Sequence, residues 1–188
     1  MTHSFPLHPL LAKPADWESP FLTVNDEGSP LRFGIRDAFS YHGYDAPGGV
    51  VLGFRLLQRA FALLAPGKTP ERRKLALHTA FPGFGLRDTM ELVTRMVTDG
   101  RYSVDTAIDD ERAQEGVAGR FYYCFAFEGR SVELAPIPGY PGPDFIRLGK
   151  ASKLPGFSCA DAGAWKAAKF ELANTLLAAP ADAVIRVL

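Results

Sequence analysis

The amino-acid sequence predicts an α+β domain in which an antiparallel or mixed sheet carries helices packed on it. Apolar residues recur at helical spacing in three long segments, at residues 47–64, 86–98 and 160–177. The expected strands gather between residues 102 and 134 instead of alternating strictly with helices, which favours this class over a doubly wound sheet. The length of 188 residues suits one domain.

The N-terminal part of the chain is expected to be an irregular arm over residues 1–34, and residues 35–188 form the α+β domain. The arm is rich in proline, which excludes a long helix. These prolines are Pro6, Pro9, Pro14, Pro20 and Pro30. Residues 35–41 are expected to form a short helical turn that leads into His42.

The first long helix is expected over residues 47–64, with Pro47 in its first turn and Asp45 close to its N-cap. Its apolar positions step by three or four residues and define one face. They are Val50, Phe54, Leu57, Phe61 and Leu64. Glycines at positions 48, 49 and 53 weaken the helix, so we expect another backbone to pack closely against its first turns.

Short alternating segments predict the strands. Glu128-Gly129 is a good hairpin connection between two of them. The expected strands cover residues 74–79, 102–108, 120–127, 130–134, 145–148 and 183–187. A rigid loop is expected over residues 136–143.

Composition restricts the classes of function. Twenty-one basic residues balance twenty-one acidic ones, which argues against nucleic-acid binding because that requires a basic face. No apolar run is long enough to span a membrane, and residues 1–20 lack the pattern of a signal peptide, so a cytoplasmic location is expected. The two cysteines, Cys124 and Cys159, do not form a disulfide scaffold or a CxxC motif.

The loop over residues 41–49 is the main candidate site. It places His42 and Asp45 at a helix N-terminus beside Gly48 and Gly49, where the helix dipole and free N–H groups favour an anion. The alternative is a tight glycine turn in which Asp45 caps the helix and His42 is a satisfied partner.

Several segments together resemble the FmdE-like family, which takes its name from one component of formylmethanofuran dehydrogenase. HGYDAPGGVVLGFRL (residues 42–56) is similar to the H-G-H-x-C-P-G segment that opens the family's conserved helix. KLALHTAFPGFGLRDTMELVT (residues 74–94) is similar to its strand, loop and second helix, with Asp88 on a family aspartate. Further similar segments follow in the same order, and the resemblance covers residues 35–188.

The resemblance implies a fold similar to the sheet domain of glyceraldehyde phosphate dehydrogenase, and a metal, commonly zinc, on histidine and cysteine ligands. Only His42 remains of the family's H-x-H-x-C arrangement, because Tyr44 and Ala46 occupy the other two positions. Gly85 stands where the family has a further cysteine. The thiolate ligands of the family pattern are therefore absent.

A metal site rebuilt from other residues is one hypothesis. Two histidines and a carboxylate suit a catalytic zinc or a non-haem iron. We expect His42, His78 and Asp88 as ligands of a divalent transition metal, zinc first. The residues expected to contact a ligand are Tyr44, Asp45, Gly48 and Gly85. Complete loss of the metal is the alternative.

Two functions follow. The domain binds a metal ion or small ligand near His42, which would act as ligand or general base in an enzyme, with Asp88 as its partner. Alternatively, it is a non-catalytic interaction or oligomerisation domain, such as a homodimer, that has lost the site. A functional His42 is expected to line a cavity with a second titratable group, whereas a relic would be hydrogen-bonded to backbone and packed shut.

Overall fold

The computed structural model describes residues 8–11 and 21–188, and it has the predicted α+β class. Within these residues, five strands form a mixed sheet in the order β4-β3-β5-β6-β7. β3 pairs parallel to β4, and the other pairs are antiparallel. The strands are β3 (Ala76–Thr79), β4 (Tyr102–Val104), β5 (Tyr123–Phe127), β6 (Arg130–Pro136) and β7 (Ile185–Val187).

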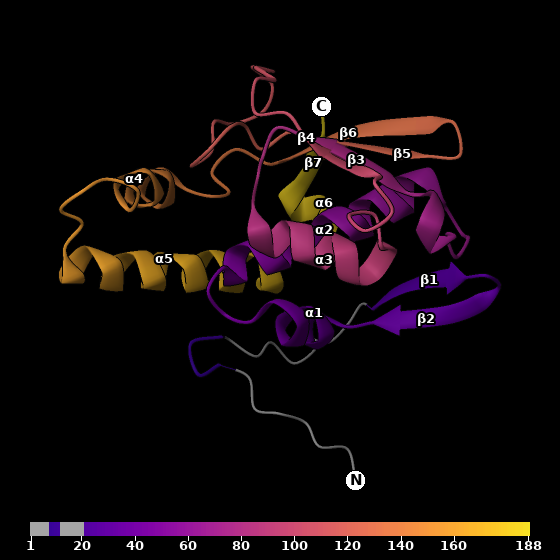
Figure 1. Cartoon of the computed structure of the whole chain (residues 1–188), viewed down its shortest axis with the longest axis horizontal. Coiled ribbons are helices and arrows are strands. Elements are labelled where there is room, and N and C mark those ends of the chain that lie inside the picture. Colours follow the sequence, from indigo (N-terminus) through magenta and orange to yellow (C-terminus); the bar gives the residue numbers. More distant parts are fainter. Residues whose placement is uncertain (1–7, 12–20) are drawn as a thin grey trace, which may run out of the picture.

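Helices cover one face of this sheet. Figure 1 shows α2 and α3 beneath it, with α1 on the far side of these two helices and α4 and α5 extending to one side. The helices are α1 (Ile35–His42), α2 (Pro47–Leu64), α3 (Phe84–Thr94), α4 (Pro143–Ala151), α5 (Cys159–Ala178) and α6 (Ala181–Val184), with a 3₁₀ turn η1 (Arg72–Lys74) before β3.

The predicted long helices are confirmed, and α2 begins and ends at the predicted residues. The second one is shifted, because α3 begins two residues before the expected 86–98 and ends at Thr94. Arg95 adopts the left-handed conformation (φ 58°) and its N–H closes the last turn on the carbonyl of Glu91, which ends the helix.

The prediction of an irregular arm over residues 1–34 is wrong in its last part. β1 (Leu22–Asp26) and β2 (Ser29–Phe33) form an antiparallel hairpin whose turn residues, Glu27 and Gly28, have positive φ. Leu22 and Val24 alternate with exposed or half-exposed neighbours and are buried, which is the pattern of a strand. Residues 1–7 and 12–20 of the expected arm lie outside the described residues.

A second prediction is also wrong, because residues 145–148 lie in helix α4 and not in a strand. Pro143 occupies the first helical turn and Asp144 is an acidic residue beside the helix N-terminus, and both favour a helix start. Within this helix, Leu148 is buried and Ile146 is half-buried.

Helix α2 is the centre of the core. Residues 50–57 are all buried, because α2 contacts α3 and α5 on its flanks and the sheet through β5 and β6. Apart from Arg55, residues 50–57 are all apolar, so the single apolar face predicted from sequence is only part of the buried surface of α2. From the sheet, Tyr123, Phe125 and Leu134 complete the same core.

Glycines allow α2 and α3 to approach each other closely, as the sequence predicted. A Cβ added to Gly85 would lie 2.7 Å from the carbonyl oxygen of Ala46 and 2.9 Å from the backbone nitrogen of Val50. A Cβ on Gly53 would lie 3.2 Å from Cα of Leu86. These contacts fix the N-terminus of α3 beside the N-terminus of α2, which positions the candidate site.

Three arginines, of which Arg55 and Arg72 are buried and Arg130 is exposed, satisfy the last carbonyl groups of three helices. Arg55 donates to two carbonyls at the end of α5, Arg72 to two at the end of α3, and Arg130 to two at the end of α2. The final carbonyls of a helix lack partners within it and carry partial negative charge, so a guanidinium is well suited to them. The acceptors are Leu176 and Leu177, Leu92 and Val93, and Leu63 and Leu64.

Candidate functional site

His42 lies between two carboxylates from different parts of the chain. Its Nδ1 is 2.8 Å from Oδ2 of Asp88 on α3, and its Nε2 is 2.9 Å from Oδ1 of Asp45. The His42 side chain is 6% exposed, that of Asp88 is 27% exposed and that of Asp45 is 83% exposed. The imidazole is therefore buried beneath an aspartate that is itself open to solvent.

Local backbone geometry places these groups. Gly43 has a φ of 89°, which α1 requires in order to end directly after His42, and its N–H donates to the carbonyl of Phe39. The turn that follows carries Asp45 and leads into α2. The close approach at Gly85 then brings α3 alongside, so that Asp88, one turn further on, reaches the ring of His42.

The two ring nitrogens of His42 differ in their surroundings. A carboxylate only accepts hydrogen bonds, so Nδ1 carries the proton that is donated to Asp88. Nε2 is buried and makes no hydrogen bond within the described part of the chain, because Oδ1 of Asp45 is close but not aligned with it. When Nδ1 holds the single proton of a neutral imidazole, Nε2 presents a lone pair to a ligand.

The other residues expected to contact a ligand have packing roles in the structure. The ring of Tyr44 stacks on Phe39, with ring centroids 5.3 Å apart, and is half-buried. Gly48 lies under the side chain of Leu172 from α5, and Gly85 lies against the backbone of α2. Of these four residues, Asp45 alone has its side-chain oxygen beside the ring of His42.

The structure does not bring His78 to His42. His78 is an exposed residue of β3 whose Nδ1 lies 2.8 Å from Oγ of Ser103. In β3, the neighbouring Leu77 and Thr79 are buried toward the helices, so His78 points to the opposite face of the sheet from α3. The predicted set of His42, His78 and Asp88 is therefore not assembled as one group of ligands.

His42 does not belong to a larger group of metal ligands in the described residues, and it does not line any of the four cavities described next. No group of three or more His, Cys, Asp or Glu side chains in residues 8–11 and 21–188 is arranged to hold a metal ion. Four surface cavities of the described chain are lined by other residues and do not include His42. His42 thus has the expected titratable partners, but Asp45 covers the ring.

Two residues near the site had no signal in the sequence. Lys169 of α5 donates from Nζ to the backbone carbonyl of Asp45. Burial lowers the pKa of Lys169, although the negative charge of Asp45 acts to raise it. Tyr102 of β4 has a buried hydroxyl without a hydrogen bond in the described residues. Burial raises the pKa of Tyr102 to about 12, and the charges of Arg87 and Asp88 act on it. Lys169 thus contacts the turn that carries Asp45, and Tyr102 is linked to the site through the charge of Asp88.

Comparison with known proteins gives no assignment. No protein-family model matches the sequence, and no curated protein matches it. Among the described residues, none of the helices has the length and apolar character needed to cross a membrane.

Proposed function

We propose that this domain binds a small ligand at Nε2 of His42, and that the ligand is a divalent transition metal ion such as zinc. The observation that carries the proposal is the buried Nε2 without a hydrogen bond. A buried polar atom left without a partner costs about 1–3 kcal/mol, so such an atom is commonly satisfied by a bound molecule.

The residues beside Nε2 fit an ion with two protein ligands. Nε2 and Oδ1 of Asp45 are 2.9 Å apart. Two ligands at about 2.1 Å from one tetrahedral ion are separated by roughly 3.4 Å, so these two atoms would move apart by about 0.5 Å when zinc binds. Asp45 is exposed and adjusts its side chain without disturbing the core. Because a structural zinc site has four protein ligands, we expect weak and exchangeable binding here.

Asp88 has the position of an orienting carboxylate. It accepts from Nδ1 of His42, which fixes the ring and leaves Nε2 as the ligating atom. Metal-binding histidines commonly donate their second N–H to a carboxylate in this way. The resemblance of residues 42–56 to the FmdE-like family supports the same assignment, since His42 matches the first histidine of that family's motif.

The test is calorimetric titration of zinc into untagged, metal-free protein, with elemental analysis of the protein as purified. We expect one ion per chain in the wild type and loss of binding in His42→Gln. His78→Gln is the matched control, because His78 is exposed on the other face of the sheet. Binding that persists in His42→Gln, or that is absent from the wild type after zinc is added, would contradict the proposal.

A second candidate function is an interaction domain, and one observation favours it. Phe84 is 76% exposed at the start of α3 and Tyr41 is 52% exposed in the last turn of α1, so large aromatic side chains adjoin the candidate site. Light scattering on the wild type and on Phe84→Ser tests this candidate. A homodimer that dissociates in the variant supports it, and a monomeric wild type contradicts self-association.

A further inference from the structure

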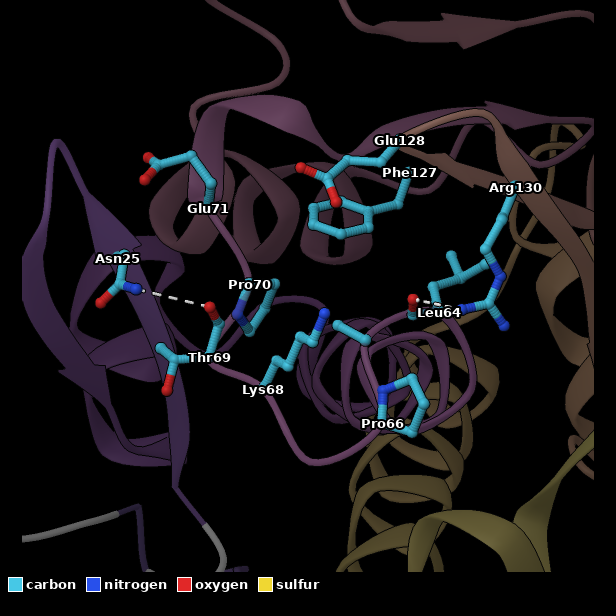
Figure 2. A pocket seen from close by; sticks show the side chains of 11 residues that line it. Asn25, Leu64, Pro66, Lys68, Thr69, Pro70, Glu71, Phe127, Glu128 and Arg130 are labelled. Carbon is cyan, nitrogen blue, oxygen red and sulfur yellow. Dashed lines mark hydrogen bonds between the residues drawn. The ribbon is translucent and has the colours of Figure 1, made fainter.

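A separate cavity lies at the opposite end of α2 from His42. It has a volume of about 430 Å³, within the range of small-molecule sites. The 18 residues of α2 place it about 27 Å from the His42 end of the helix, so it is independent of the proposed function. Figure 2 shows this cavity where the end of α2, the segment after it, the β1–β2 hairpin and the β5–β6 turn meet.

The inner wall of the cavity is apolar. Phe127 lies at its back, with Leu64 and Pro70 on either side, and Figure 2 shows the ring of Phe127 facing the space between them. All three residues are buried in the folded chain. This wall suits an aliphatic or aromatic group of a ligand.

The rim of the cavity is held in place by backbone hydrogen bonds. The N–H of Lys68 donates to the carbonyl of Ala65, and the N–H of Asn25 donates to the carbonyl of Pro70 over 2.9 Å. Asn25 also forms a parallel bridge with Glu71. The segment that carries Lys68 and Glu71 is thereby fixed to both α2 and β1, so the site is formed before a ligand arrives.

Two of the charged groups that line the cavity are already engaged. Glu128 accepts from Lys74 over 2.6 Å, and Arg130 donates to the carbonyls of Leu63 and Leu64. The other two, Lys68 and Glu71, make no side-chain hydrogen bond or close ion pair with described residues, and their charges act only at longer range, Lys68 on Glu128 and Glu71 on Lys74. Figure 2 shows Lys68 extending toward the ring of Phe127, and Glu71 on another side of the opening with its carboxylate directed away from that ring.

We propose that this cavity binds a small zwitterion with an apolar side chain, of the class of free α-amino acids. The carboxylate of the ligand pairs with Lys68, its ammonium group pairs with Glu71, and its side chain packs on Phe127. One cation and one anion in the same cavity, neither of them in a direct ion pair, complement a molecule that carries both charges. A simple anion or cation would satisfy only one of them.

The probes are L-leucine and two analogues that each lack one charge: 4-methylpentanoate has no ammonium group, and 3-methylbutylamine has no carboxylate. Each is titrated to about 10 mM into ¹⁵N-labelled protein, a range suited to dissociation constants near 1 mM. Amide chemical shifts report binding. We expect saturable shifts with L-leucine at Thr69, Glu71 and Phe127, and roughly tenfold weaker binding of either analogue.

Variants assign the two charges. Lys68→Gln and Glu71→Gln should each weaken L-leucine binding by roughly tenfold, since each removes one charge-assisted contact. Lys166→Gln, at an exposed position on α5, is the control and should bind as the wild type does. The proposal is overturned by an absence of shifts at these three amides, by an analogue that binds as tightly as L-leucine, or by unchanged affinity in both variants.

Discussion

Nδ1 of His42 lies 2.8 Å from Oδ2 of Asp88, although the two residues are 46 positions apart in sequence. This contact joins the last turn of α1 to α3 and decides which nitrogen of the imidazole is left for a ligand. The chemistry proposed for the site depends on this pair, with Asp45 at the other nitrogen.

Asp88→Asn tests the orienting role. The amide can present its NH₂ group to Nδ1, which would favour the other tautomer and place the ring proton on Nε2. We expect zinc affinity to fall by roughly 10–100-fold, as is usual when a carboxylate behind a metal-binding histidine is removed. ¹⁵N spectra of the imidazole would report the change of tautomer. Asp144→Asn, at an exposed residue of α4, should leave both affinity and spectrum unchanged.

Gly85→Ala tests the close approach of α2 and α3. The added methyl group would lie within 3 Å of two backbone atoms, which cannot move as a flexible side chain can. We expect a loss of about 1–3 kcal/mol in the free energy of unfolding, or more, measured by urea denaturation. Gly163→Ala is the matched control: its Cβ meets nothing within 4 Å, and it lies inside α5. That change should stabilise the protein by about 0.5–1 kcal/mol, and equal effects of the two changes would contradict the packing argument.

Arg72→Met tests the arginine that closes α3. Arg72 is 8% exposed, donates to two carbonyls at the end of that helix, and pairs with Asp26 of the β1–β2 hairpin. Its loss leaves several polar groups unpaired, so we expect a destabilisation of about 2–4 kcal/mol by chemical denaturation. Arg147→Met removes an exposed pair with Asp144 and should change stability by less than about 0.5 kcal/mol. Similar losses in both variants would argue against the capping role.

Glu91→Gln tests a carboxylate that ties the end of α3 to the residues after it. Burial on its own would raise the pKa of Glu91, but hydrogen bonds from Thr98 and the N–H of Val97, with the charge of Arg95, outweigh it and lower that pKa. A lowered folded-state pKa stabilises the protein above the ordinary pKa of glutamate, and this contribution is lost as pH falls through the lowered value.

The wild type should therefore be more stable than Glu91→Gln at pH 7, and the difference should shrink as pH falls below about 4.5. Urea denaturation at several pH values measures this difference. Glu111→Gln, at an exposed loop position, should follow the wild-type profile. A difference between wild type and Glu91→Gln that is constant from pH 7 to pH 3 would contradict the ionised role of Glu91.

Local sequence signals were sufficient for much of the fold. Pro47 begins α2 and the Pro66-Gly67 pair follows its end, so both limits of that helix are visible in the sequence. The turn at Glu128-Gly129 likewise joins β5 and β6 as predicted. In contrast, the β1–β2 hairpin was hidden by its prolines, since Pro30 lies in a strand that pairs with β1 alone among the described strands.

The site was harder to predict because it depends on which face of the sheet the helices cover. The alternation in β3 already placed His78 opposite Leu77, and Leu77 is buried under the helices, so His78 points away from His42. The contact of Lys169 with Asp45 spans 124 positions and has no local pattern. Asp88 was expected as the partner of His42 from the family resemblance, but their contact depends on the glycine approach between α2 and α3, which spacing alone does not specify.

The most direct test of the proposed function is the ¹⁵N spectrum of the His42 imidazole during addition of zinc to metal-free protein. We expect the Nε2 resonance of His42 to shift as zinc binds, while Nδ1 keeps the signature of a protonated nitrogen bonded to Asp88 and the ring of His78 is unchanged. A His42 ring that does not respond to zinc, or a response through Nδ1, would contradict the assignment of Nε2 as the ligand-binding atom.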